Sequence, residues 1–490
     1  MIPDNIKKHR PKGTEIHKRG NYYYVYNITS VWDKEKKRPK KKTLGCVGKI
    51  TEADGFIPNK KSQQLDVQSV QTKEYGGFSL LSELNRDLID NLKKSFPSEY
   101  QRIFTIALLR VLTCTPFTSI DTPYIRSYAS DVFPNLALSK NSIGYFLDYV
   151  GNNRGKITEF LKSTISDGDL LLFDGTSLFT DSKITELVKK GYNNNGKSKT
   201  QVNLLYAFNK STASPSYYRI LPGNVVDKVS FKNTILEMNI KDCVIVGDKG
   251  FYSTTNMGYL KKNNLKFILP LMRNSTILEN YQEGLNDTNK YEGFFMYNKR
   301  PIWYRMYENG SDYIYQFYDS RRKETKEIEY LSKIDENYGG YTLEDFREKN
   351  KYFGAFSFIS NMKETPKKIY ETYKCRWEIE AAFNNLKNNL GLDNINVSSK
   401  ARVEGVTFLN HISLKIYYSL INKMKENDLF KKHTANEILT LVSNIMIVTI
   451  NGKSQYISET TKKEKELILS LGLDLSAIEK ELSTQNLGNL

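Results

Sequence analysis

Apolar and polar positions divide the chain into segments of different periodicity. Residues 20–50 read as a β-rich strand, a lysine-rich tip and a return strand, which predicts a β-hairpin. From Gly76 to about residue 165 the apolar positions recur at helical spacing, and the stretch YQRIFTIALLRVL is too apolar for an exposed helix. We therefore expect a β/helical N-terminal region, 1–75, followed by a helical region, 76–165.

Beyond residue 165 the pattern changes to short apolar runs, which are typical of buried strands. Three such runs are followed by a helical segment and a fourth run: DLLLFDGTSLF, QVNLLYAFN, SYYRILPGN, then DKVSFKNTILEMN, then DCVIVGDKGF. This β-β-β-α-β succession is that of a ribonuclease H-like core. We assign the first part of that core to residues 166–265.

The next segment is rich in aromatic residues. Between Tyr291 and Tyr318 there are 11 of them, and they alternate with other residues as in antiparallel strands. This predicts a β-rich insertion, 266–362. The core resumes in 363–425 with a helix that begins after Thr365 and ends before Gly391. A helical C-terminal region, 426–490, completes an α/β protein.

The charge of the chain points to a polyanionic partner. Net charge is +17 and the pI is about 9.3. Residues 1–75 hold 17 Lys and Arg against 8 Asp and Glu, a difference of +9, which leaves +8 for the other 415 residues. Nucleic acid is the simplest such partner, so we expect the basic region 1–75 to bind DNA. Lysines at the hairpin tip fit contacts with DNA phosphates, and they fit a solubilising loop equally well.

Cysteine and histidine are too few and too scattered for a zinc site or a disulfide framework. The four cysteines form no CxxC pair: Cys46, Cys114, Cys243 and Cys375. A reducing cytoplasm is consistent with this usage. No apolar run approaches 18 residues, so no membrane partner is expected.

Four polar residues in the helix before Gly391 have a spacing that places them on one face. They are Tyr373, Arg376, Glu380 and Lys387, at offsets 0, 3, 7 and 14. At 3.6 residues per turn these positions fall within about 60° of one another. A carboxylate flanked by cations and a phenol suits a helix that lies against a phosphodiester and a metal ion. A solvated face with an Arg–Glu pair is the alternative.

Two predicted strands deliver an aspartate at or near their carboxyl ends. These are Asp174 in LLLFDGT and Asp248 in VIVGDKGF, at the sheet edge where α/β proteins bind ligands. Each is also an ordinary turn former, and Asp167 and Asp169 compete with Asp174. With Glu380 they supply the carboxylate oxygens that Mg²⁺ takes, and two such ions suffice for an in-line displacement at phosphorus.

These motifs together resemble the DDE transposases of bacterial insertion sequences, in the group with the Tyr-(2)-Arg-(3)-Glu-(6)-Lys signature. The signature is present here with its spacing intact. The resemblance also covers DGTSLF around Asp174, LPGNVVD at 221–227 and GDKGFYS around Asp248. It spans roughly residues 166–420.

The resemblance implies a ribonuclease H-like core with a β-rich insertion and a Mg²⁺-dependent enzyme, with Mn²⁺ as a substitute. Asp174, Asp248 and Glu380 would hold the metal, and Tyr373, Arg376 and Lys387 would hold DNA phosphates. The expected reaction is cleavage at element ends followed by strand transfer, by cut-and-paste. Partners would be double-stranded DNA, as terminal inverted repeats and as target, and a second copy in the synaptic complex.

Two further expectations come with this resemblance. Cut-and-paste relatives stack a flipped base on aromatic side chains, and Trp303 in the insertion is a candidate for that role, with a core tryptophan as the alternative. The expected location is the bacterial cytoplasm, on the nucleoid when DNA is bound. A metal-dependent nuclease without strand transfer, or a non-catalytic transposase-derived DNA-binding protein, remains an alternative function.

Overall fold

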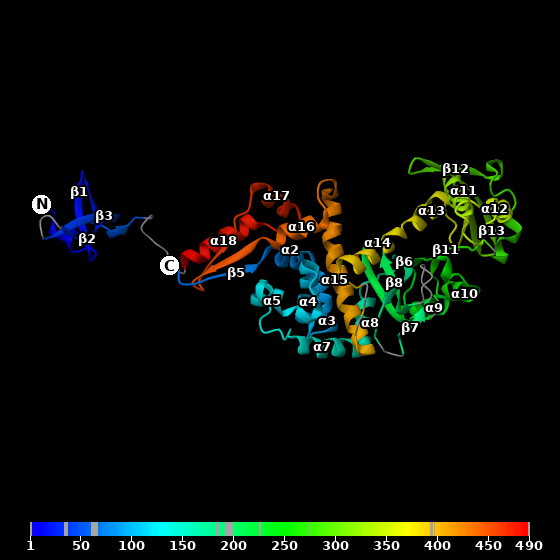
Figure 1. Cartoon of the computed structure of the whole chain (residues 1–490), viewed down its shortest axis with the longest axis horizontal. Coiled ribbons are helices and arrows are strands. Elements are labelled where there is room, and N and C mark those ends of the chain that lie inside the picture. Colours follow the sequence, from blue (N-terminus) through cyan, green and yellow to red (C-terminus); the bar gives the residue numbers. More distant parts are fainter. Residues whose placement is uncertain are drawn as a thin grey trace. The chain divides into compact units, whose positions relative to one another are not determined.

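The computed structural model describes residues 2–33, 38–59, 67–182, 186–191, 199–224, 227–273, 275–392, 395 and 397–488. The chain forms two compact units, Met1–Gln71 with Thr449–Ser454, and Thr72–Val448 with Gln455–Leu490 (Figure 1). Each unit has its own buried apolar cluster. Within the described ranges, no helix has the length and apolar character needed to cross a membrane.

The first unit contains an antiparallel sheet of order β1-β2-β3-β4. Its elements are α1 (Asp4–Lys7), β1 (Thr14–Arg19), β2 (Tyr22–Asp33), β3 (Arg38–Thr51) and β4 (Gly55–Pro58). One face of the sheet contributes Ile16, Val25 and Ile50 to a small buried core, and Ile6 of α1 completes it. The predicted hairpin is β2 and β3. Residues 38–42 belong to β3 rather than to the tip, and the tip residues 34–37 lie outside the described residues.

Helices fill the region 76–165 of the second unit, as predicted. They are α2 (Gly76–Leu84), α3 (Arg86–Ser95), α4 (Tyr100–Thr113), α5 (Asp121–Arg126), α6 (Ala129–Val132), α7 (Lys140–Asn152) and α8 (Arg154–Lys162). The long α15 (Lys400–Glu426) crosses α7 closely because both have a glycine there. A Cβ atom on Gly151 would lie 1.7 Å from the Ala401 carbonyl oxygen. Figure 1 shows α15 between these helices and the sheet that follows.

The central sheet is mixed, and its order places β6 in the middle of the core. The core elements are β6 (Leu170–Phe179), β7 (Lys189–Gly191), β8 (Lys199–Asn209), β9 (Ser214–Pro222), α9 (Asp227–Met238), β10 (Val244–Val246), α10 (Thr254–Lys262) and β11 (Lys266–Pro270). The order β9-β8-β6-β10-β11 is antiparallel up to β6 and parallel beyond it. The α/β class is confirmed, and the β-β-β-α-β succession is present as β6, β8, β9, α9 and β10.

The insertion extends the same sheet and differs from the prediction in two ways. It contains β12 (Gly293–Tyr297), β13 (Arg300–Asn309), β14 (Asp312–Tyr318), α11 (Ser320–Asp335), α12 (Leu343–Asn350) and β15 (Ala355–Ser360). β11 lies in the range predicted as insertion, yet it pairs with β10 as a core strand. The sequence does not predict the helices α11 and α12, because their sequences are mostly charged and polar and neither helix buries a residue.

The segment predicted as one helix before Gly391 is divided into three parts. They are α13 (Pro366–Lys374), α14 (Trp377–Asn384) and a π-helical turn, η5 (Asn385–Asn389). Thr365 caps α13 through the Lys368 N–H, as predicted. The C-terminal region adds α16 (Ala435–Ser443), β16 (Met446–Ile450), β17 (Ser454–Ile457), α17 (Lys462–Ser470) and α18 (Leu475–Gly488). Its two strands, which join β5 (Val70–Glu74) in the order β17-β16-β5, contradict an all-helical C-terminus.

Candidate active site

Asp174 and Asp248 occupy equivalent positions on neighbouring parallel strands. Leu172 of β6 pairs with Val246 of β10, and each aspartate follows its paired residue by two positions. Equal offsets along parallel strands place both aspartates at the same level, just beyond the part of β6 that pairs with β10. The Asp174 side chain is also held locally, since its Oδ1 accepts a hydrogen bond from the Gly175 N–H at 2.9 Å.

Arg376 connects Asp174 to Glu380. One terminal nitrogen of the guanidinium lies 2.9 Å from Asp174 Oδ2, and the other lies 2.7 Å from Glu380 Oε1. A tightened turn precedes α14, because the Arg376 N–H bonds to the Tyr373 carbonyl oxygen three residues back. That turn presents Arg376 and Glu380 to Asp174. Asp174 lies in the middle of β6 (Leu170–Phe179) and not, as the sequence predicted, near its carboxyl end, because β6 continues in its pairing with β8. The Glu380 side chain is 56% exposed and the Arg376 side chain only 19%.

The electrostatics show that the three predicted carboxylates share one neighbourhood. Burial raises the pKa of Asp174 to about 6, although the nearby Arg376 acts in the opposite direction. Asp248 and Glu380 both raise this pKa further by charge repulsion. Burial also raises the pKa of the Tyr373 hydroxyl, which lies beside Arg376. The structure therefore brings Asp174, Asp248, Glu380, Arg376 and Tyr373 together.

The competing acidic residues have other partners. Asp169 directly precedes β6, and its Oδ2 accepts hydrogen bonds from the Ser166 N–H and the Asn209 amide. Glu378 is buried and forms an ion pair with Lys210 at 2.7 Å. Asp169 thus caps a turn, and Glu378 is held by Lys210 and not by Arg376.

Lys387 lies in the π-turn, and so it does not continue the α-helical face that the sequence predicted. A π-turn closes i→i+5 bonds, which shifts the angular position of every residue in it. The turn is held from outside by α4. The Arg110 guanidinium donates to the Leu390 carbonyl oxygen, and Cys114 Sγ lies 3.0 Å from the Asn389 carbonyl oxygen.

Arg110 supports the π-turn that carries Lys387, and the sequence motifs do not include it. It is 4% exposed, and it also bonds to the Thr115 carbonyl oxygen at 2.8 Å and to Asn410 Oδ1 at 3.1 Å. No carboxylate pairs with it among the described residues, and burial lowers its pKa to about 10. The signal was present in the sequence as an arginine inside the apolar run IFTIALLRVL of α4.

A cavity of about 630 Å³ opens directly beside the carboxylates. Asp248, Tyr373 and Arg376 form part of its wall. The rest of the wall includes four more cations and three more aromatic rings: Lys249, Arg273, Arg322, Lys374, Tyr352, Phe356 and Phe358. Trp303 is not part of this wall. It lies half-buried in β13 with its ring centre 5.3 Å from that of Phe294. Trp303 is therefore neither a fully buried core residue nor a residue beside the carboxylates.

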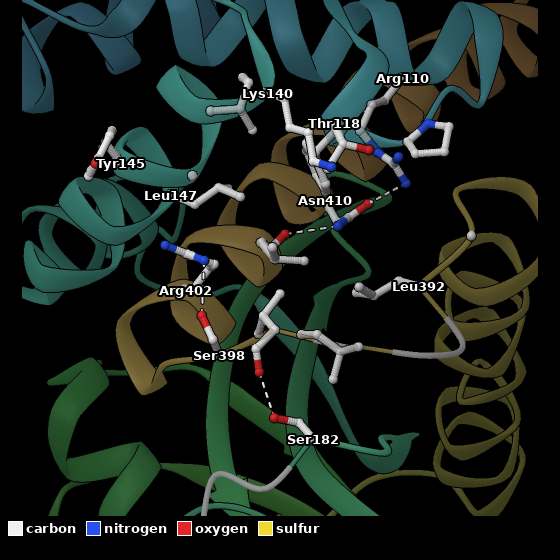
Figure 2. A pocket seen from close by; sticks show the side chains of 18 of the residues that line it. Arg110, Thr118, Lys140, Tyr145, Leu147, Ser182, Leu392, Ser398, Arg402 and Asn410 are labelled. Carbon is white, nitrogen blue, oxygen red and sulfur yellow. Dashed lines mark hydrogen bonds between the residues drawn. The ribbon is translucent and has the colours of Figure 1, made fainter.

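A larger cavity of about 1470 Å³ lies elsewhere, between α4, α7 and the start of α15. Figure 2 shows Arg110 and Asn410 joined by their hydrogen bond on its wall, with Arg402 and Ser398 farther along it. None of the three predicted catalytic carboxylates lines it. We therefore assign the active site to the region of the smaller cavity, whose wall contains Asp248 and also Arg376, the partner of Asp174 and Glu380.

Metal binding requires a rearrangement of this site. Asp174, Asp248 and Glu380 are the hard oxygen donors that Mg²⁺ and Mn²⁺ accept. In the described residues, however, no three acidic, histidine or cysteine side chains are close enough to hold an ion together. Arg376 occupies one oxygen of Asp174 and one of Glu380 instead. The donor set fits a hard divalent cation once the guanidinium has left.

Comparison with solved structures finds distant similarity to transposases bound to DNA. One is a piggyBac transposase synaptic complex with hairpin DNA, at 10% identity and a TM-score of 0.41, over 70% of each chain. Another is a Mos1 transposase paired-end complex with the left transposon end, at 12% identity and a TM-score of 0.15, over 40% of this chain and 58% of that one. Comparison with curated proteins finds no match.

A family model gives a direct assignment. The model described as "Transposase DDE domain" matches residues 165–414. This range begins just before β6 and ends inside α15, so it contains both aspartates, the insertion and the helix of Glu380. Because the match spans half of the chain, the protein belongs to the family of transposases with a DDE domain.

Proposed function

We propose that this transposase cleaves DNA at the ends of a bacterial insertion sequence and transfers the freed strands to target DNA by cut-and-paste. The observation that supports this best is the register of β6 and β10. It places Asp174 and Asp248 side by side on a ribonuclease H-like sheet, and Arg376 links Asp174 to Glu380. Phosphodiester chemistry needs little from a protein beyond such placement of charge.

Asp174, Asp248 and Glu380 would hold Mg²⁺ or Mn²⁺. The bound metal would supply an activated attacking oxygen and would neutralise charge on the leaving oxygen. Arg376 would then be free to bind a DNA phosphate, and Tyr373 would orient it through their contact. Lys387 would contact a second phosphate from the π-turn. These three side chains position the DNA and take no part in bond making.

The cavity beside Asp248 would receive the DNA at the cut. Its cations suit the backbone, and the half-buried rings of Tyr352 and Phe356 would stack with an unpaired base if cleavage passes through a DNA hairpin. Trp303 remains a second candidate for base stacking. A 2-aminopurine at the terminal position would distinguish them, because its fluorescence is quenched when it stacks. Phe356→Ala should restore the fluorescence if the cavity is used, and Trp303→Ala if β13 is used.

Joining two ends requires at least two copies of the chain, so we propose a homodimer in the synaptic complex. The expected location remains the bacterial cytoplasm.

The test is incubation of the protein with Mg²⁺ and duplexes that carry the DNA flanking its coding sequence, with cleavage and joining measured separately. Cleavage followed by joining is the expected result. Cleavage without joining would identify a nuclease, and binding without cleavage would identify a non-catalytic DNA-binding protein. Either result would contradict the proposal.

A further inference from the structure

The outer face of the sheet in the first unit has a composition unusual for a solvated surface. The face opposite the core includes seven residues that we call the tyrosine face: Glu15, His17, Arg19, Tyr22, Tyr24, Tyr26 and Lys49. Their register is continuous, since Arg19 pairs with Tyr22 and Tyr24 pairs with both His17 and Lys49. The free face of a small antiparallel sheet is usually polar. Three tyrosines in a row therefore require an explanation.

Cations of the tyrosine face lie over its rings. Lys49 Nζ lies 5.7 Å from the Tyr22 ring centre, and the Arg19 guanidinium lies 5.9 Å from that of Tyr26. Such cation–π contacts restrict the freedom of long basic side chains and leave their charge at the surface. The rings thus hold the cations in place for a partner.

The one carboxylate of this face is already neutralised. Glu15 forms an ion pair with Lys41 of β3, and its other carboxylate oxygen lies within hydrogen-bond distance of His17 Nε2, at 2.7 Å. These contacts lower the pKa of Glu15, so it stays ionised and paired. The net charge that the tyrosine face offers to a partner is therefore positive.

The hairpin continues beyond the core as an exposed two-stranded arm. Residues 38–45 of β3 are all exposed, and they pair with β2 over Ile28–Asp33. The arm carries Arg38, Lys40 and Lys42 at alternate positions, about 7 Å apart along one side. Trp32 is 62% exposed on it. A two-stranded ribbon with these side chains has the width that the DNA major groove admits.

We propose that the tyrosine face and the arm form a docking surface for double-stranded DNA, with Arg19 and Lys49 on phosphates and the arm in a groove. This inference deepens the proposed function, because it places the DNA contact in a unit that the family match does not reach. Duplex is favoured over single-stranded DNA because Arg19 and Lys49 cover the ring faces on which unpaired bases would stack.

The test uses full-length protein and a short mixed-sequence duplex, with affinity measured by fluorescence anisotropy over a range of salt concentrations. The double variant Arg19→Gln with Lys49→Gln should lose affinity on the order of tenfold and lower the salt slope by roughly two. Lys18→Gln is the matched control. Lys18 also lies over a tyrosine, Tyr23, but on the opposite side of β1, so its loss should change affinity less than about twofold.

The charge-preserving pair Arg19→Lys with Lys49→Arg separates charge from folding, and it should bind the duplex as the parent does. The proposal is overturned if the glutamine pair binds like the parent, if Lys18→Gln causes an equal loss, or if the charge-preserving pair loses as much. It is also overturned if the loss is confined to single-stranded DNA. Duplex affinity is measured without cleavage. A result that contradicts the proposed catalytic function would therefore not change what the affinities show about the docking surface.

Discussion

Arg376 stands between two carboxylates that would otherwise repel each other. Asp174 is largely buried, and an ionised carboxylate without a partner in such a place is costly. The guanidinium lies 2.9 Å from Asp174 and 2.7 Å from Glu380, so it supplies the positive charge that the site needs before a metal arrives. The same side chain that stabilises the metal-free site must therefore compete with a metal for those oxygens.

This competition gives a prediction for the protein without DNA. Arg376→Gln should bind Mn²⁺ at least about tenfold more tightly than the parent, because a unit charge within a few ångströms has been removed. Isothermal titration calorimetry measures it. Arg273→Gln is the control, since Arg273 lines the same cavity without pairing to these carboxylates. Equal strengthening by both variants would show a general charge effect and refute the competition.

Glu380 and Glu378 form a matched pair two residues apart on α14. Glu380→Gln should reduce single-turnover cleavage by about a hundredfold or more and leave the free energy of unfolding almost unchanged, because Glu380 is exposed. Glu378→Ala should do the reverse, since it removes the partner of Lys210 and should destabilise by about 1–3 kcal/mol. Denaturant unfolding and cleavage rates check both, and an exchange of the two phenotypes would contradict the assignment.

At the scale of elements, the sequence was informative where a side-chain pattern is local. The strands β6 and β10, with Asp174 within the first and Asp248 just after the second, follow from short apolar runs and from the family signature. The cap at Thr365 also follows from local chemistry. By contrast, the π-turn depends on contacts of its carbonyls with Arg110 and Cys114, more than 270 residues away in the chain.

Other differences have similar physical causes. Helical spacing of side chains predicts one continuous helix for the segment before Gly391. It gives no sign of the turn at Arg376 that separates α13 from α14. The sequence predicts that β11 belongs to the insertion, because a short apolar run does not show which strand it pairs with. In the structure it pairs with the core strand β10. The helices of the insertion have no buried face to give a pattern. The bridge that Arg376 forms between Asp174 and Glu380 depends on distances in the folded structure, which the spacing of residues along the chain does not give.

The contact between α4 and the π-turn gives a prediction at this scale. Arg110→Met should slow single-turnover cleavage about tenfold, because the turn that carries Lys387 loses the donor to the Leu390 carbonyl oxygen. Arg102→Met is the matched control on the same helix. Arg102 also donates to carbonyl oxygens, of Ala137 and Ser142, but it does not touch the catalytic helix.

Both arginine variants should lower the melting temperature, since each leaves buried carbonyl groups without a donor. Only Arg110→Met should slow cleavage at a temperature where both proteins are folded. An equal loss of rate in both variants would mean that Arg110 supports the fold and does not position the π-turn.

At the scale of the molecule, we propose that the first unit binds DNA and the second unit carries out the chemistry. The first 75 residues hold just over half of the net positive charge, and the second unit holds the carboxylates. Binding and chemistry should therefore be separable by substitution. Glu380→Gln should bind a duplex as the parent does, whereas Arg19→Gln with Lys49→Gln should bind weakly yet cleave at nearly the parental rate when protein is saturating.

Single-turnover rates over a range of protein concentrations check this separation. The binding variant should change the concentration needed for half-maximal rate, and the catalytic variant should change the maximal rate. A fall in the maximal rate of the Arg19 and Lys49 variant would show that the first unit also takes part in the cleavage step.

The most direct test of the central claim is the metal dependence of cysteine variants at the three carboxylates. A thiolate is a poor ligand for Mg²⁺ and is better tolerated by Mn²⁺, which is the softer ion. Cleavage by Asp174→Cys, Asp248→Cys and Glu380→Cys should be lost in Mg²⁺ and partly regained in Mn²⁺, relative to the parent in each metal. An equal loss in both metals would contradict a catalytic metal site formed by Asp174, Asp248 and Glu380.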